Sequence, residues 1–177
     1  MSTTVKRHNI FLAGMMGSGK STIGRMLAGR LDYSFVDTDE RIESICSLKV
    51  AEIFTVMRET HFRELETSLL NTVVRRENQV IATGGGMLVN HLNMQTANEN
   101  GMVVYLSAPI PVLVERLRHA KDRPLLSGFD LYPRLEDIYK TRRETYESIL
   151  RKVETDGVTF DTIVDSIIAL YEKWQEE

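Results

Sequence analysis

The sequence has 177 residues, of which 42% are hydrophobic and 27% are charged, and its formal net charge at pH 7 is −3. This length suits one domain with a full core, so we expect residues 1–177 to form a single domain. The slightly acidic charge gives no electrostatic reason to expect a nucleic acid partner, and no apolar run approaches transmembrane length. Cys46 is the only cysteine, which excludes an internal disulfide and a cysteine-based zinc site and fits a reducing cytoplasm.

The first predicted strand, residues 8–13, leads into a glycine-rich loop. Residues 14–21 match the phosphate-binding pattern G-x-x-x-x-G-K-[ST]. Glycine permits backbone angles at which N–H groups form a nest for an anion, and the following helix adds the positive end of its dipole. An ordinary glycine-rich turn is the alternative. The residues of this loop that we expect to contact a nucleotide are Gly14, Gly17, Ser18, Gly19, Lys20, Ser21 and Thr22.

Strand-like and helical segments alternate through the rest of the chain. Further strands are predicted over residues 33–36, 79–83 and 102–106, with a short fifth strand near residue 153. Helices are predicted up to residue 31, from the second strand to residue 44, over 50–76 with a break near Thr60, and over 92–97, 111–119, 135–152 and 163–174. This alternation predicts a three-layer α/β/α fold with a five-stranded parallel sheet.

Two acidic residues, Asp37 and Asp39, occupy alternate positions just past the second strand. One carboxylate can face Mg²⁺, directly or through water, and the other can accept a proton or a hydrogen bond from a substrate hydroxyl group. The alternative is a structural role, in which these residues cap a helix and supply acids to its first turn.

Gly84, Gly85 and Gly86 follow the third strand. Three consecutive glycines lose much conformational entropy on folding, so we expect a backbone that a ligand approaches closely, with a plain turn as the alternative. Ligands of parallel sheets bind at the carboxyl ends of the strands. We therefore expect these glycines, the two aspartates and the phosphate-binding loop to meet at one edge of the sheet.

Several arginines are candidate anion ligands, because a guanidinium group binds a carboxylate or phosphate with a two-pronged fork. Arg63, Arg142 and Arg143 lie on predicted helices, and Arg123 lies in an irregular segment. From the residue type alone, each is more often a solvated surface residue. Residues 121–132 have no periodicity and are rich in charge, Gly and Pro, so we expect a mobile lid over about residues 118–132.

Taken together, these motifs resemble those of shikimate kinases, within the P-loop group that is similar to nucleoside-monophosphate kinases. The resemblance covers nearly the whole chain and rests on the order and spacing of GMMGSGKSTIGR, FVDTDERIE, FRELE, VIATGGGML, VVYLSAP and DRPLL, followed by Arg142 and Tyr146. It implies a kinase of aromatic amino-acid biosynthesis that uses Mg²⁺ and ATP to phosphorylate the 3-hydroxyl of shikimate. It also implies ATP and shikimate as small-molecule partners, without a nucleic acid or membrane partner, and we expect a monomer.

The resemblance implies roles for the residues on the nucleotide side. Lys20 and the loop backbone would bind the ATP phosphates, Ser21 would bind Mg²⁺, and Asp37 would hold Mg²⁺ through water. Arg123, on the lid, would neutralise charge on the phosphoryl group during transfer. Arg116 would lie against adenine, with the neighbouring Arg118 as an alternative.

On the acceptor side, the resemblance implies a substrate-binding helical region over about residues 37–65. Asp39 would contact the substrate hydroxyls and act as the catalytic base, or at least orient the attacking oxygen. Arg63 and Arg142 would hold the substrate carboxylate, and the backbone of Gly84, Gly85 and Gly86 would contact the substrate.

The chain departs from the family pattern beside Tyr146. Family members often have proline two residues before this tyrosine, where this chain has Glu144, and Arg143 directly follows Arg142. The spacing of four residues in the sequence from Arg142 to Tyr146 favours Arg142 as the ligand of the carboxylate, with Arg143 as the alternative.

Other functions remain open alongside the kinase hypothesis. One is a kinase of another hydroxyacid, such as gluconate, or of a nucleotide. Another is a non-catalytic domain that senses shikimate or a nucleotide. A GTP-dependent switch would need guanine-binding motifs such as N-K-x-D and D-x-x-G, and the sequence contains neither.

Overall fold

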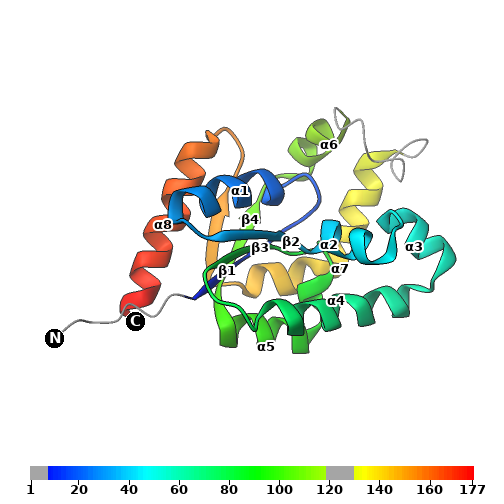
Figure 1. Ribbon diagram of the computed structural model, residues 1–177. Coiled ribbons are helices and arrows are strands. Elements are labelled where there is room, and N and C mark those ends of the chain that lie inside the picture. The colour runs from blue at the N-terminus through cyan, green and yellow to red at the C-terminus, as the bar shows by residue number, and fades with distance from the viewer. Residues whose placement is uncertain (1–7, 119–129) are drawn as a thin grey trace.

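The computed structural model describes residues 8–118 and 130–177. Most of the predicted lid, including Arg123, therefore lies outside the described residues. Within these ranges the chain forms a parallel β-sheet with helices on both faces (Figure 1).

The sheet has five parallel strands in the order β2-β3-β1-β4-β5, as the alternation of elements predicts. Strand β1 lies at the centre and pairs with β3 on one side and β4 on the other. All five strands run the same way, so their carboxyl ends lie at one edge. The strands are β1 Asn9–Ala13, β2 Ser34–Asp37, β3 Gln79–Ala82, β4 Gly101–Ser107 and β5 Arg151–Glu154.

Helices cover both faces of the sheet, which confirms the predicted three-layer α/β/α fold. Helices α1 and α8 lie on one face, and α4, α5 and α7 lie on the other (Figure 1). The helices are α1 Lys20–Leu31, α2 Thr38–Cys46, α3 Val50–Val56, α4 Glu59–Val73, the short 3₁₀ helix η1 Met87–Val89, α5 His91–Asn100, α6 Ile110–Arg118, α7 Leu131–Ser148 and α8 Phe160–Glu176.

The central strand divides the core into two parts. Because successive side chains of a strand point to opposite faces, Ile10 and Leu12 pack against α1 and α8, while Phe11 and Ala13 pack on the other side. All four are at most 1% exposed. A strand buried on both faces is typical of a parallel sheet, and here it holds the start of the glycine-rich loop in a fixed position.

The structure corrects both ends of one predicted helix. The predicted helix over residues 135–152 begins at Leu131, because the Asp130 side chain accepts a hydrogen bond from the Tyr132 N–H and caps the first turn. It ends at Ser148, because Arg151–Glu154 pairs with β4 as the fifth strand.

The helical region over residues 50–76 is interrupted between α3 and α4, slightly earlier than the predicted break at Thr60. Met57 and Arg58 have extended backbone angles, and Thr60 lies in the first turn of α4. Glu59 supplies an acidic residue to that turn, which favours a helix start there. None of the helices in the described part of the chain is long and apolar enough to cross a membrane.

Candidate active site

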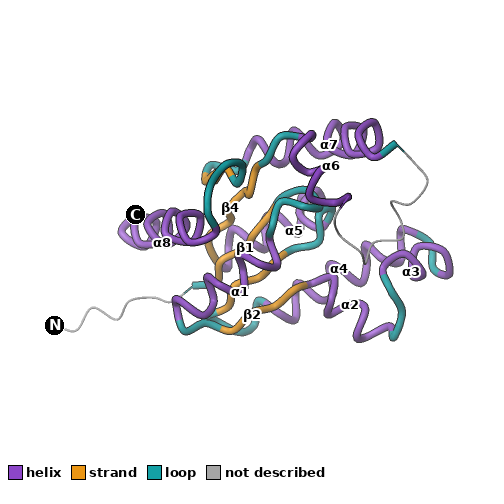
Figure 2. The backbone as a smooth tube through the Cα atoms, turned by 90° about the horizontal axis from the view of Figure 1, so that it is seen from above, coloured by secondary structure: helices purple, strands orange, loops and turns teal. Residues whose placement is uncertain are grey.

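The strand order brings the predicted site residues to one edge of the sheet. The loops that follow β1, β2 and β3 are neighbours there, with α2 and α3 on one side and α6 and α7 on the other (Figure 2). Backbone contacts join the loops: the Thr83 N–H donates to the Leu12 carbonyl at 3.1 Å, and the Gly84 N–H donates to the Thr38 hydroxyl at 2.8 Å.

The phosphate-binding loop has the backbone that a nest for an anion requires. Gly14, Gly17 and Gly19 have φ angles of 146°, 82° and 94°, which L-amino acids with a side chain rarely adopt. Gly19 is the N-cap of α1, so the N-terminus of this helix faces the loop. The Lys20 ammonium group donates to the carbonyls of Gly14 at 2.8 Å and Met15 at 3.0 Å. The Lys20 side chain thus lies against the loop with which it is expected to bind phosphates.

Two hydroxyl residues of this motif occupy different environments. Ser18 is 1% exposed, and its hydroxyl oxygen has no hydrogen-bond partner among the described residues. Thr22 is exposed in the first turn of α1. The structure therefore places the Ser18 side chain inside the loop and the Thr22 side chain at its surface.

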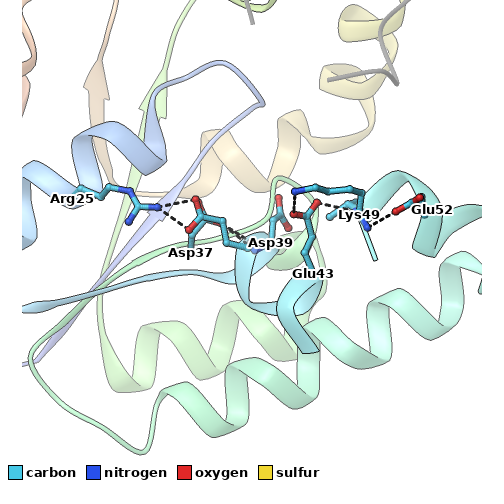
Figure 3. A network of polar contacts seen from close by, with 8 residues as sticks. Arg25, Asp37, Asp39, Glu43, Lys49 and Glu52 are labelled. Atoms are coloured by element: carbon cyan, nitrogen blue, oxygen red, sulfur yellow. Dashed lines mark hydrogen bonds and ion pairs between the residues drawn. The ribbon is translucent and has the colours of Figure 1, made fainter. Parts of the chain in front are cut away.

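Asp37 lies at the junction of β2 and α2. One carboxylate oxygen accepts hydrogen bonds from the N–H groups of Asp39 and Glu40, which makes Asp37 the N-cap of α2 (Figure 3). The other accepts a hydrogen bond from the Ser21 hydroxyl at 2.6 Å. Asp37 therefore has the helix-capping role that the sequence analysis gave as an alternative, through one carboxylate oxygen. Its other oxygen is bonded to Ser21, the second residue that the resemblance assigns to Mg²⁺.

The Ser21–Asp37 pair brings two oxygen-bearing side chains together. Both side chains offer oxygen ligands, which Mg²⁺ prefers. The described residues contain no cluster of three or more His, Cys, Asp or Glu side chains that could hold a metal. A sparse oxygen site suits Mg²⁺, because this ion is usually held by one or two protein oxygens together with substrate phosphates.

Asp39 lies against the first of the three glycines. A Cβ atom on Gly84 would lie 2.5 Å from the Asp39 carboxylate and 3.0 Å from the Glu66 carboxylate. Figure 3 shows Asp37 and Asp39 near the start of α2, with Glu43, Lys49 and Glu52 further along. Glu43 accepts hydrogen bonds from the Lys49 ammonium group and the Val50 N–H, so α3 is fastened to the helix that carries Asp39.

Arg63 and Glu66 form an ion pair on α4 next to the third glycine. The Arg63 guanidinium lies 2.7 Å from Glu66 and 2.9 Å from Glu59. A Cβ atom on Gly86 would lie 2.5 Å from an Arg63 nitrogen. Glu66 is 1% exposed, and burial raises its carboxyl pKa against the opposing effect of Arg63. We assigned no role to Glu66 from the sequence, although its spacing of three residues from Arg63 on a helix was a usable signal.

The structure separates Arg142 from Arg143. Arg142 is half-buried on α7, and one of its guanidinium nitrogens would lie 2.8 Å from a Cβ atom on Gly85. Arg143 is exposed. Tyr146, one turn further along α7, donates a hydrogen bond from its hydroxyl to the Gly85 carbonyl. Each of the three glycines thus has a charged side chain against it: Asp39, Arg142 and Arg63.

Arg116 extends from α6 to the phosphate-binding loop. It donates to the Gly17 carbonyl at 3.3 Å and to the hydroxyl and carbonyl of Thr155, which follows β5. Arg118 is largely exposed and lies 3.8 Å from Glu115. Of the two arginines proposed for adenine, the structure places Arg116 beside the loop and Arg118 at the surface.

Comparisons with known proteins match this architecture and these motifs. The family model described as shikimate kinase matches residues 16–172. A shikimate kinase of Pelotomaculum thermopropionicum is 40% identical over 160 residues, which cover 90% of this chain and 93% of that protein. A shikimate kinase of Microcystis aeruginosa is 44% identical over 161 residues, covering 90% and 84% of the two chains.

Solved structures show the same likeness. The shikimate kinase of Acinetobacter baumannii, solved in complex with shikimate, superposes with a TM-score of 0.88 at 34% identity and covers 95% of this chain and 94% of its own. A gluconokinase of Sinorhizobium meliloti has a TM-score of 0.64 at 20% identity, covers 96% and 94% of the two chains, and shares the fold alone. From the family model and these relatives, the chain belongs to the shikimate kinase family.

Proposed function

We propose that this protein transfers the γ-phosphoryl group of ATP to the 3-hydroxyl of shikimate, giving ADP and shikimate 3-phosphate. One observation carries the assignment of roles: Asp39, Arg63 and Arg142 converge on three consecutive glycines beside a phosphate-binding loop. Two cations and one acid suit an acceptor that carries a carboxylate and hydroxyl groups.

Arg63 and Arg142 would hold the substrate carboxylate. They come from different helices, α4 and α7, and they lie against neighbouring glycines. Two guanidinium groups from different helices fix the orientation of a carboxylate as well as its position, and positioning supplies much of the catalysis of phosphoryl transfer. The buried Glu66 holds Arg63 in place through their ion pair.

Asp39 would accept the proton of the 3-hydroxyl as its oxygen forms a bond to the γ-phosphorus. The bond between this phosphorus and the oxygen that bridges it to the β-phosphate breaks, and ADP leaves with the electron pair. Lys20 and the N–H groups of its loop would offset the negative charge on the phosphates. When bound, Mg²⁺ would neutralise phosphate charge, and Ser21 and Asp37 are the residues that would hold it.

Further parts of the proposal come from the family resemblance. Arg123 would neutralise charge from the lid, and Arg116 would lie against adenine. We also propose that residues 1–177 act as one domain and a monomer, with a lid over about residues 118–132 and a substrate-binding helical region over about residues 37–65. The single cysteine favours a cytoplasmic location.

A coupled assay of ADP release tests the function directly. The protein is incubated with Mg²⁺ and ATP, and release is compared with shikimate, quinate, gluconate and no acceptor. We expect fast release with shikimate alone. Fast release with gluconate would reassign the acceptor, and slow release with every acceptor in a protein that still binds ATP would favour a sensor.

A further inference from the structure

Tyr146 is buried next to the three glycines without carrying any charge of its own. Its side chain is 1% exposed, and its ring stacks on Tyr105 of β4 with centroids 5.0 Å apart and planes 14° from parallel. Its hydroxyl donates a hydrogen bond to the carbonyl of Gly85. The strand β4 thus fixes the ring, and the ring fixes the position of the hydroxyl.

Two residues of α7 act on the same glycine. Arg142 lies one turn before Tyr146, and its guanidinium occupies the space that a Gly85 side chain would fill. Residues four apart on a helix lie on the same face, so the hydroxyl of Tyr146 and the guanidinium of Arg142 approach Gly85 together. The position of Gly85 is therefore coupled to the part of α7 that carries a proposed carboxylate ligand.

The bond to Gly85 also sets the orientation of the next amide. The Gly85 carbonyl and the Gly86 N–H belong to one planar trans peptide unit, in which the two groups point in opposite directions. A carbonyl drawn toward Tyr146 therefore turns the Gly86 N–H away from Tyr146. Without this bond, a run of three glycines would have more backbone freedom than any other tripeptide.

We propose that Tyr146 is a positioning residue for the acceptor, whose hydroxyl fixes the Gly85–Gly86 peptide so that the Gly86 N–H points at bound shikimate. This inference rests on the proposed function. It assigns the tyrosine an effect on the acceptor and none on the nucleotide, because its hydroxyl interacts with Gly85 and Arg142, both on the acceptor side.

The hydroxyl keeps its proton in the working range of a kinase. Burial raises the pKa of Tyr146 to about 12, so near neutral pH the group is a hydrogen-bond donor. A carbonyl accepts only from a donor, so the protonated form is the one that can hold Gly85. The Tyr146 hydroxyl therefore stays protonated between pH 6 and pH 9, and its hydrogen bond to Gly85 should not depend on pH in this range.

Two matched variants test the proposal. Tyr146→Phe removes the hydroxyl and keeps the stacked ring. Tyr171→Phe removes another buried hydroxyl that donates to a backbone carbonyl, that of His8 at 2.9 Å, on α8 and away from the three glycines. We expect Tyr146→Phe to raise the KM for shikimate by roughly three- to tenfold, the effect of one lost hydrogen bond, with the KM for ATP unchanged. Tyr171→Phe should leave both constants near their wild-type values.

Amide hydrogen exchange supplies a readout that does not depend on activity. In Tyr146→Phe without substrate, the amides of residues 84–87 should exchange faster, while those of α8 should keep their wild-type rates. A general loss of stability would instead accelerate exchange throughout the sheet and helices. Unchanged exchange at residues 84–87, or equal rises in the KM for shikimate and for ATP, would overturn the proposal.

The outcomes separate this inference from the function on which it rests. If the wild type phosphorylates shikimate and Tyr146→Phe behaves like Tyr171→Phe, the positioning role is wrong and the function stands. If the wild type does not phosphorylate shikimate, both fail.

A second substitution covers the case in which Tyr146→Phe does not fold. Placing 3,5-difluorotyrosine at position 146 keeps the ring and hydroxyl but makes the phenol more acidic. The groups around it are Arg142 on its own helix and Tyr105 on β4, whose own pKa is raised by burial. The KM for shikimate should then rise over the pH range in which the ultraviolet absorbance shows this phenol ionising, and a KM that stays flat across that range would overturn the proposal.

Discussion

The two glycine-rich segments of the site use glycine for different physical reasons. In the phosphate-binding loop, Gly17 and Gly19 have φ angles of 82° and 94°, so the backbone conformation itself requires glycine. In the segment 84–86, no φ angle lies in that region, but a Cβ atom at any position would collide with a charged side chain. The first segment needs glycine for its shape, and the second needs it for space.

This difference explains how one site can handle two unlike anions. A phosphate chain is recognised by backbone N–H groups and a helix N-terminus, which demand an unusual backbone. A carboxylate on a small hydroxylated ring is recognised by side chains, which demand room beside the backbone. If this division is correct, substitutions on the two sides should affect different substrates.

Asp39→Asn should have the largest effect, because it removes the proposed base and keeps the size of the side chain. We expect turnover to fall by about 10²- to 10⁴-fold, the usual contribution of a general base, with ATP binding nearly unchanged. Steady-state kinetics and a nucleotide titration measure the two quantities. Asp137→Asn, at an exposed position of α7, is the control and should behave as wild type. Wild-type turnover in Asp39→Asn would exclude Asp39 from the mechanism.

A comparison of Arg142→Ala with Arg143→Ala tests which arginine binds the substrate carboxylate. Arg142 lies against Gly85 and its neighbour is exposed, so only the first should bind the carboxylate. We expect Arg142→Ala to raise the KM for shikimate about 10- to 100-fold, the loss of one charge-assisted contact. Arg143→Ala should change it less than twofold. The reverse order would place the carboxylate on Arg143.

Alanine at one glycine of each segment tests the division itself. In Gly85→Ala the new Cβ would lie 2.8 Å from the Arg142 guanidinium and displace it, so the KM for shikimate should rise about tenfold. In Gly17→Ala the left-handed φ angle becomes strained, so the KM for ATP should rise by about the same factor. Both effects appear in one kinetic matrix with the two substrates varied in turn. Equal changes in both constants for both variants would show that the two halves of the site are not separable.

The fold could be predicted from the sequence because its signals are local. The apolar run before the glycine-rich loop and the fully apolar fourth strand are typical of a buried parallel sheet, and both form as expected. The end of α7 could not be placed in this way, because helical periodicity continues past Ser148 until pairing with β4 takes over. Tertiary contacts, which no local pattern contains, decided that boundary.

The site could be outlined from its motifs but not resolved. We explained Gly84, Gly85 and Gly86 by the approach of a ligand, whereas the structure shows three charged side chains already in that space. The choice between Arg142 and Arg143 depends on which of these adjacent residues faces the three glycines. This depends on the rotation of α7 about its axis, and the sequence does not define that rotation. The spacing of Glu66 from Arg63 indicates an ion pair on one helix, but only the tertiary packing shows that this acid is buried beside the site.

Glu66→Gln gives the smallest expected effect and tests that buried acid. Burial holds the pKa of Glu66 above its usual value, with Arg63 opposing and the charge of Asp39 adding to the rise. A raised pKa in the folded state means that folding favours the protonated form. The contribution of Glu66 to stability is therefore present below the unfolded pKa and lost as pH rises through the folded pKa.

The Tm of the wild type relative to Glu66→Gln should rise as the pH is lowered from 7 to 5, on the order of a few degrees for a domain of this size. Differential scanning calorimetry across this range measures it, with the exposed Glu144→Gln as the control that should show no such trend. A difference that instead grows with rising pH would mean that the ion pair with Arg63 outweighs the cost of burying the Glu66 carboxylate.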